Sequence, residues 1–262
     1  MMSLSVDAML KNITSGKTEV EVKEKKAKKE KKRPDFDVTD FRDGARGILT
    51  WAEVANGKIT RPSYELLTPA MALAKTLDEN TKVTTLLMGS KGVKTHAQSL
   101  IAHGSDEVIV VEDDRLDEYL VLPFASIFAQ VIKKINPEIA LFAASTAGRE
   151  LAPRIGVKTH GGVTADCTDL GIGKHIDRKK KTIFAPILES RRPTYGESKL
   201  ATILGFVCPQ ISTARAGTFE VPAMDENRKG KISNFKPKLD KEDFSVEVIE
   251  TVRGEGGLQN LF

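Results

Sequence analysis

Apolar, strand-like runs alternate with amphipathic helical stretches from about residue 47 to residue 156, and this alternation constrains the fold more than any other feature. In the helical stretches, leucine and alanine recur three or four positions apart, which places them on one face of a helix. Strands that are joined through helices by short connections run parallel, and helices then cover both faces of the sheet. We therefore predict an α/β fold whose mostly parallel sheet is flanked by helices. The predicted strands are residues 48–54, 83–89, 107–111 and 139–144, and the predicted helices are residues 63–77, 93–103, 120–135 and 149–156.

The second half of the chain has strand-like runs without helices between them. Residues 182–188, residues 199–207 and the run up to Phe219 fit strands, and they predict an antiparallel extension of the same sheet. Beyond about residue 220 we predict a linker that contains one strand, at residues 244–249.

Residues 1–45 are predicted to form a flexible N-terminal extension. Nine basic and four acidic residues lie between Lys17 and Arg33, and such a tract cannot bury apolar surface. It serves either as a solvated tether or as a docking tail for an acidic partner. The predicted organisation is therefore an extension over residues 1–45, a domain over residues 46–222 and a linker over residues 223–262.

Charge and cysteine usage exclude several classes of protein. The Lys-rich tract accounts for the net charge of +4, and because a nucleic-acid-binding domain carries its basic patch within the fold, we expect no nucleic-acid partner. No apolar run approaches the ~20 residues of a membrane span, and the N-terminus resembles neither a secretory signal nor a transit peptide. Two cysteines without Cys-x-x-Cys spacing suit a reducing compartment and encode no iron–sulfur cluster or structural zinc site. These features predict a cytoplasmic protein.

The common catalytic motifs do not occur in this sequence. There is no Gly-x-Ser-x-Gly elbow, no P-loop and no Gly-x-Gly-x-x-Gly after the first strand, and the four histidines lack metal-ligand spacing. We therefore predict neither a catalytic set nor a metal site. Among the histidines, His160 alone has a place beside a candidate site, because it lies in the loop after the helix near residue 149.

The turn between the fourth predicted strand and its helix is the candidate cofactor-binding site. Small residues from Ser145 to Gly148 form this turn, and the N–H groups at the start of a helix favour an anionic ligand. Arg149 follows directly. Its planar, permanently charged guanidinium is either a partner in a structural salt bridge or a cation aimed at an anionic or electron-rich ligand.

Four motifs in series resemble the alpha subunit of electron-transfer flavoproteins, whose first domain has an adenine-nucleotide-hydrolase-like α/β fold. The resemblance covers about residues 46–250, and several ordered motifs are far more specific than one. The motifs are residues 145–154 (STAGRELAPR), 162–168 (GVTADCT), 192–203 (RPTYGESKLATI) and 208–219 (CPQISTARAGTF).

The resemblance implies a heterodimer with a beta subunit of similar fold, in which FAD carries electrons between a dehydrogenase, such as an acyl-CoA dehydrogenase, and another acceptor. One FAD would be shared with or held by the beta subunit, and a second would sit in a C-terminal domain to which residues 223–262 lead and which this sequence does not include. In the electron-bifurcating branch, NADH supplies electrons and ferredoxin or flavodoxin accepts some of them; whether the chain belongs to that branch stays open. There the Thr-x-Gly-Arg turn faces the beta-subunit flavin. The candidate cofactor-binding residues are therefore Ser145, Thr146, Gly148, Arg149, His160 and Thr164.

Two other functions stay open at this point. The chain could be a structural partner subunit whose flavin site is idle, because the flavin-binding C-terminal domain is not part of the sequence. It could instead be an adenine-nucleotide-binding α/β protein. That class needs a Gly- or Ser-rich phosphate loop after the first strand, and residues 51–57 do not provide one.

Overall fold

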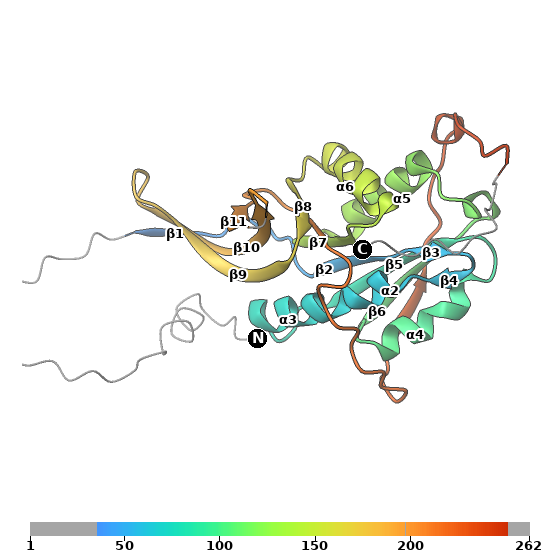
Figure 1. Ribbon diagram of the computed structural model, residues 1–262, viewed down its shortest axis with the longest axis horizontal. Helices are drawn as coiled ribbons and strands as arrows, with labels where there is room; N and C mark the ends of the chain where they lie inside the picture. The colour runs from blue at the N-terminus through green and yellow to red at the C-terminus, as the bar shows by residue number, and fades with distance from the viewer. Residues whose placement is uncertain (1–35, 197, 251–262) are drawn as a thin grey trace, which may run out of the picture. The chain divides into compact units, whose positions relative to one another are not determined.

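The computed structural model describes residues 36–196 and 198–250, and it contains one fully parallel sheet of seven strands (Figure 1). The strand order is β13-β6-β5-β2-β7-β12-β8, and each neighbouring pair runs parallel. The predicted α/β fold is therefore confirmed. The strands are β2 (Ile48–Ala52), β5 (Val83–Gly89), β6 (Glu107–Glu112), β7 (Ile139–Ala143), β8 (Val163–Cys167), β12 (Gln210–Ala214) and β13 (Lys231–Asn234).

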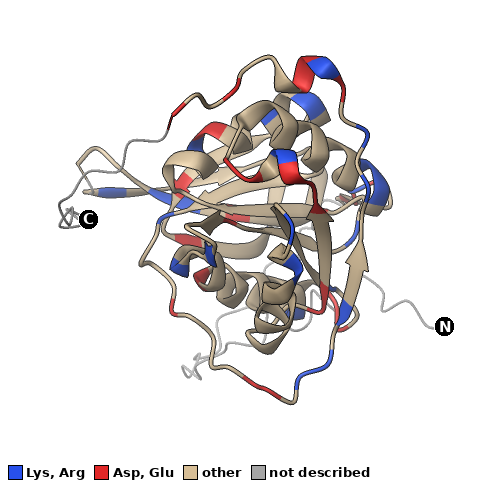
Figure 2. Cartoon of the chain, turned by 90° about the vertical axis from the view of Figure 1, so that its right-hand side faces the viewer, with Lys and Arg blue, Asp and Glu red and all other residues tan. Residues whose placement is uncertain are grey.

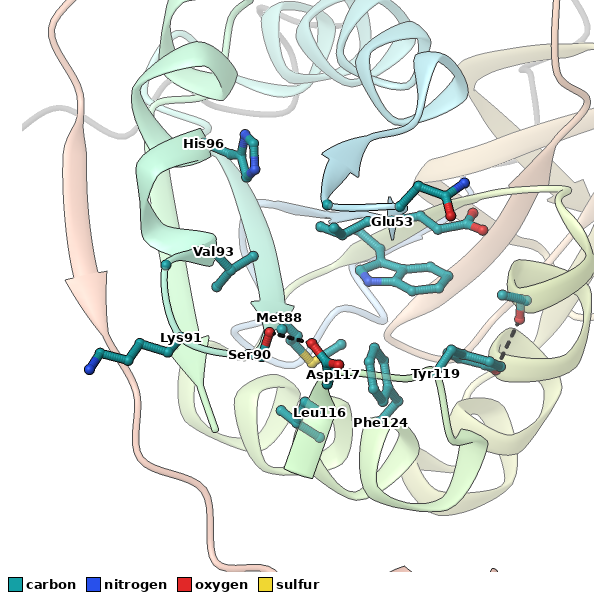
Figure 3. A pocket seen from close by; sticks show the side chains of 17 residues that line it. Glu53, Met88, Ser90, Lys91, Val93, His96, Leu116, Asp117, Tyr119 and Phe124 are labelled. Atoms are coloured by element: carbon teal, nitrogen blue, oxygen red, sulfur yellow. Dashed lines mark hydrogen bonds between the residues drawn. The ribbon is translucent and has the colours of Figure 1, made fainter. Parts of the chain in front are cut away.

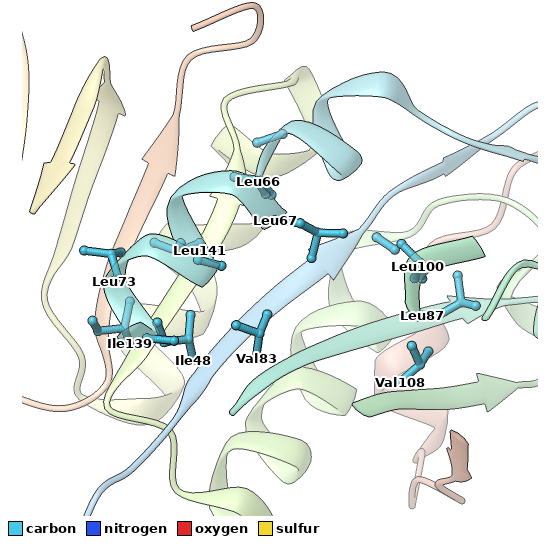
Figure 4. Close-up of a cluster of buried hydrophobic side chains, with 14 of the residues drawn as sticks. Ile48, Leu66, Leu67, Leu73, Val83, Leu87, Leu100, Val108, Ile139 and Leu141 are labelled. Atoms are coloured by element: carbon cyan, nitrogen blue, oxygen red, sulfur yellow. The ribbon is translucent and has the colours of Figure 1, made fainter. Parts of the chain in front are cut away.

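Helices cover both faces of this sheet. Successive side chains of a strand point to opposite faces, so each strand contributes to two separate clusters of buried residues. In β2, Ile48 packs with the cluster under α3 (Leu67–Leu77) and α4 (Ala97–Ala102), whereas Leu49 packs with the cluster under α5 (Val121–Ile135) and α6 (Thr146–Thr159). Figure 4 shows leucines of the helices that cover the first of these clusters, lying over aliphatic side chains of the strands. The helices are α2 (Arg61–Glu65), α3 (Leu67–Leu77), α4 (Ala97–Ala102), α5 (Val121–Ile135) and α6 (Thr146–Thr159), with 3-10 turns η1 (Val93–His96), η2 (Asp114–Leu116) and η3 (Lys241–Phe244).

The antiparallel strands form a second, four-stranded sheet instead of continuing the first one. The long strand β10 (Thr182–Thr194) pairs antiparallel with β9 (Asp169–Asp177) and with β11 (Lys199–Leu204). The short strand β1 (Asp37–Thr39), which lies in the predicted extension, pairs parallel with the start of β10. The chain then returns to the parallel sheet as β12, between β7 and β8.

Two further expectations differ from the structure. The predicted strand at residues 244–249 is wrong: η3 ends at Phe244, and residues 245–250 form no helix or strand. The predicted linker contributes β13, which extends the sheet by pairing parallel with β6. The Lys-rich tract lies outside the described residues, and the domain boundaries stay predictions.

Within residues 36–196 and 198–250, no helix is long and apolar enough to cross a membrane. Acidic and basic residues are interspersed along the elements seen in Figure 2, so from that side the described part of the chain presents both signs together. A nucleic-acid-binding face would instead gather its cations.

Candidate functional site

The site lies where the strand order of the parallel sheet reverses. From β2 the chain adds β5 and β6 on one side and then crosses to β7 on the other. In open α/β sheets, ligands bind outside the carboxyl ends of the strands at such a switch point. Glu53 follows β2 and Ser145 follows β7, so these two residues mark the switch point in this chain.

Ser145 caps α6 and links the ends of both strands. Its Oγ accepts a hydrogen bond from the Gly148 backbone N at 3.0 Å and donates one to Glu53 Oε2 at 2.6 Å. Burial raises the pKa of the Glu53 carboxyl above its usual value, and the hydrogen bond from Ser145 opposes that rise. Two predicted site residues, Ser145 and Gly148, are thus used to build the turn.

Gly148 allows the first turn of α6 to start directly above the end of β7. A Cβ atom at this position would lie only 1.9 Å from the backbone oxygen of Ala143. The close approach brings the helix start, with its unpaired N–H groups, to the edge of the sheet. The resulting geometry places Thr146 and Arg149 on the same side of the helix, three residues apart, and both are exposed.

Arg149 is anchored at its base and open at its tip. Its Nε donates to the backbone oxygen of Ala144 at 2.9 Å, and its Nη2 lies 3.5 Å from Asp166 Oδ1. The side chain is still 60% exposed. Among the residues described, its Nη1 has no hydrogen-bond acceptor within reach, so the guanidinium can bind an anionic or electron-rich group from outside the chain.

Asp166 and Arg215 complete this corner of the site; both lie in motifs of the family resemblance, but neither was among the predicted cofactor-binding residues. Arg215 follows β12, and its Nη2 lies 2.8 Å from Asp166 Oδ2. The hydrogen bond from Arg215 holds the pKa of the Asp166 carboxyl below its usual range, with further help from the charges of Arg149 and Arg192. The available signal was topological, since residues that follow neighbouring parallel strands meet at one edge.

Two predicted residues do not join Arg149. His160 caps the opposite end of α6 with a left-handed φ of 55°, and the rise of the helix puts it about 20 Å from Thr146. Thr164 lies in the edge strand β8, where it pairs with Ser212, two residues before Asp166. The structure therefore brings together Ser145, Thr146, Gly148 and Arg149, and it separates His160 from them.

A pocket of about 300 Å³ opens at the carboxyl ends of β2 and β5. Figure 3 shows Glu53 on one side of it and Ser90 with Asp117 on another, where Ser90 Oγ donates to Asp117 Oδ1 at 2.7 Å. The loop after β5 could receive a phosphate, but Glu112 Oε1 already accepts from the Gly92 N at 2.9 Å and the Lys94 N at 3.4 Å. The Glu112 carboxylate therefore already binds the backbone N–H groups that a phosphate would need, which argues against the nucleotide-binding alternative.

Among the described residues, no group of three or more His, Cys, Asp or Glu side chains is placed to hold a metal ion. The donor groups at the switch point include the anchored guanidinium of Arg149 and the start of α6. This set suits a flavin ring or another electron-rich group that a partner presents, because a permanent cation stabilises negative charge on such a group.

Comparison with known proteins gives a consistent family. The family model of the electron transfer flavoprotein domain matches residues 48–240. The chain is 35% identical to the electron transfer flavoprotein subunit alpha of Megasphaera elsdenii, over 80% of this chain and 60% of that protein. It is 31% identical to the same subunit of Thermoanaerobacterium thermosaccharolyticum, over 86% of this chain and 63% of that protein. It is 29% identical to the lactate dehydrogenase (NAD(+),ferredoxin) subunit LctC of Acetobacterium woodii, over 81% of this chain and 48% of that protein. The chain thus spans less than two thirds of the length of these relatives.

Proposed function

This chain belongs to the electron transfer flavoprotein family, and from that premise we propose that it works as the alpha-type subunit of an electron-carrying flavoprotein complex. The complex would carry electrons between a dehydrogenase and a second acceptor. The chain itself breaks no bond in a substrate. Its task is to bind a beta-type subunit and to present the carboxyl edge of its sheet to a flavin.

The observation that carries this proposal is the exposed, anchored guanidinium of Arg149 at the switch point. The bond from Nε to the Ala144 oxygen fixes where the side chain leaves the sheet. The 60% exposure of the side chain leaves its outer N–H groups free to meet a group held by another subunit. The Thr-x-Gly-Arg turn of the family resemblance corresponds to this position.

FAD is the proposed cofactor, and when bound it supplies one- and two-electron chemistry through its ring system. We propose that the beta-type subunit holds this FAD, or shares it with the present chain, and that a C-terminal domain of the alpha subunit holds a second one. Thr146 and Arg149 are the residues that would meet the first FAD. Ser145 and Gly148 act on it only by shaping the turn.

The second sheet offers a contact surface for the beta-type subunit. Around β11 and the segment after it, four apolar side chains are at least 38% exposed. Exposed apolar groups in one stretch of chain support a protein contact there, because burying them against a partner is favourable. The four residues are Leu200, Ile203, Phe206 and Val207.

The dehydrogenase and the acceptor are proposed at the level of class. An acyl-CoA dehydrogenase-type enzyme is the proposed dehydrogenase partner. The relative from Acetobacterium woodii carries NAD(+) and ferredoxin in its name, which supports NADH as a donor and ferredoxin or flavodoxin as an acceptor in a bifurcating complex. We place the complex in the cytoplasm, as its sequence predicts.

Replacing Arg149 with glutamine tests the proposed role in the flavin-loaded complex. Loss of a positive charge beside the ring disfavours electron uptake, so we expect the reduction potential to fall by on the order of 50 mV. The measurement is a spectroelectrochemical titration of the full chain in complex with its partner subunit.

Arg154→Gln is the matched control, because Arg154 is an exposed arginine of the same helix that pairs with Glu150 instead of lying at the sheet edge. An idle flavin site, the competing proposal, predicts that the two variants have the same potential as the wild-type complex. That outcome would remove Arg149 from the site.

A further inference from the structure

We propose that Asp166 is a positioning residue that holds Arg149 and Arg215 as a pair of cations facing the flavin; this inference rests on the proposed function. Arg149 lies in the first turn of α6, which follows β7, whereas Arg215 follows β12 and Asp166 lies near the end of β8; these three strands are neighbours in the sheet. The backbones of these strands are joined at the same level. The Ala144 N donates to the Ala214 O at 2.7 Å, and the Arg215 N donates to the Cys167 O at 2.8 Å.

A bulge in β8 aims the Asp166 side chain. Ser212 pairs with Thr164 and Ala214 pairs with Cys167. Between these two pairs β8 therefore advances by three residues, whereas β12 advances by two. The extra step leaves Asp166 with a left-handed φ of 61°, a conformation that is uncommon outside glycine. Its backbone N donates to Thr213 Oγ1 at 2.8 Å, which fixes the bulge. Bulges beside functional sites commonly re-aim a side chain in this way.

The carboxylate of Asp166 contacts both arginines. Arg215 approaches it with two nitrogens, Nη2 at 2.8 Å from Oδ2 and Nε at 3.3 Å from Oδ1. Arg149 Nη2 lies 3.5 Å from the same Oδ1, while its Nε is bound to the Ala144 oxygen. The forked contact fixes Arg215, and the shared oxygen restricts the direction in which Arg149 can swing.

Two physical effects of Asp166 have opposite signs, which makes its role measurable. Its negative charge alone disfavours electrons on a nearby flavin, so simple removal of the charge would raise the reduction potential. Positioning acts in the other direction, because without the carboxylate the Arg149 guanidinium keeps only its bond to the Ala144 oxygen and Arg215 loses its forked contact, so both act on the flavin less strongly. The inference requires the second effect to exceed the first.

Asp166→Asn isolates this role, because asparagine tolerates the left-handed conformation while losing the charge. The reduction potential is measured in the flavin-loaded complex of the full chain for the wild type, Asp166→Asn, Arg149→Gln and the double variant. We expect Asp166→Asn to lower the potential in the same direction as Arg149→Gln. The double variant is expected to fall short of the sum of the two shifts, since coupled residues are not additive.

A second variant keeps the test decisive if Asp166→Asn unfolds. Arg215→Lys retains the charge and loses the forked contact, and we expect it to lower the potential as well. A raised potential in Asp166→Asn, or shifts that add fully in the double variant, would overturn the positioning role while the effect of Arg149 stands. No shift in Arg149→Gln would instead overturn the proposed function and this inference together.

Discussion

Replacing Gly148 with alanine is expected to lower the free energy of unfolding by about 3 kcal/mol or more, the upper range for overpacked sites. The added Cβ would lie 1.9 Å from the backbone oxygen of Ala143, far inside contact distance. Ala143 is the last residue of a buried central strand and pairs with Ala214 of β12, so it cannot move without disturbing that neighbour. Helix propensity acts in the opposite direction, favouring alanine by about 1 kcal/mol, so a net loss identifies the steric clash.

Chemical denaturation of the full chain measures this loss, with Gly162→Ala as the control. Gly162 lies just beyond α6, and a Cβ built there meets nothing within 4 Å. We expect the control to change stability by less than about 0.5 kcal/mol. Equal stability of the two variants would show that α6 does not begin against the Ala143 oxygen.

Replacing Arg42 with methionine is expected to cost about 3–5 kcal/mol at neutral pH, because it leaves a buried carboxylate without its cation. The Glu138 side chain is only 1% exposed, and its Oε2 lies 2.8 Å from Arg42 Nη1. Burial raises the pKa of Glu138 above its usual value, and Arg42 opposes that rise. Without Arg42 the pKa of Glu138 therefore rises further.

The raised pKa of Glu138 determines how the stability of this variant depends on pH. A carboxyl group whose pKa is raised in the folded state favours folding when protonated, and this contribution is lost as pH rises through the folded pKa. The stability deficit of Arg42→Met is therefore largest at neutral pH and shrinks on acidification toward the ordinary carboxyl range. Arg46→Met is the control, since Arg46 is 58% exposed and lies 3.9 Å from Asp40, where an ion pair contributes little. A deficit that is independent of pH would contradict the account of Glu138.

The parallel sheet could be predicted from the sequence because each of its first strands is followed by a helix with a regular apolar face. The later strands could not be placed in the same way. Two glycines, Gly171 and Gly173, weaken the strand pattern of β9, and β8 is short and contains a bulge. The return of β12 between β7 and β8 depends on long-range pairing, about which local patterns carry no information.

The candidate site was predictable to the extent that it is local. The turn from Ser145 to Arg149 combines small residues, a helix cap and a cation within one segment. Asp166 and Arg215 lie 17 and 66 residues beyond Arg149 in the sequence. Only the strand order brings them to the same corner of the site. His160 was placed correctly after the helix, but the predicted helix ended at residue 156, and α6 carries the chain about 20 Å from the turn before it reaches His160.

Titration of this chain into a flavin-loaded beta-type subunit tests the central claim most directly. The visible absorbance and fluorescence of the flavin report whether the carboxyl edge of this chain approaches the ring. We expect a spectral change that saturates at one chain per partner subunit, and Arg149→Gln should bind with the same stoichiometry but produce a smaller change. A complex that forms with no change in the flavin spectrum, or no complex at all, would contradict it.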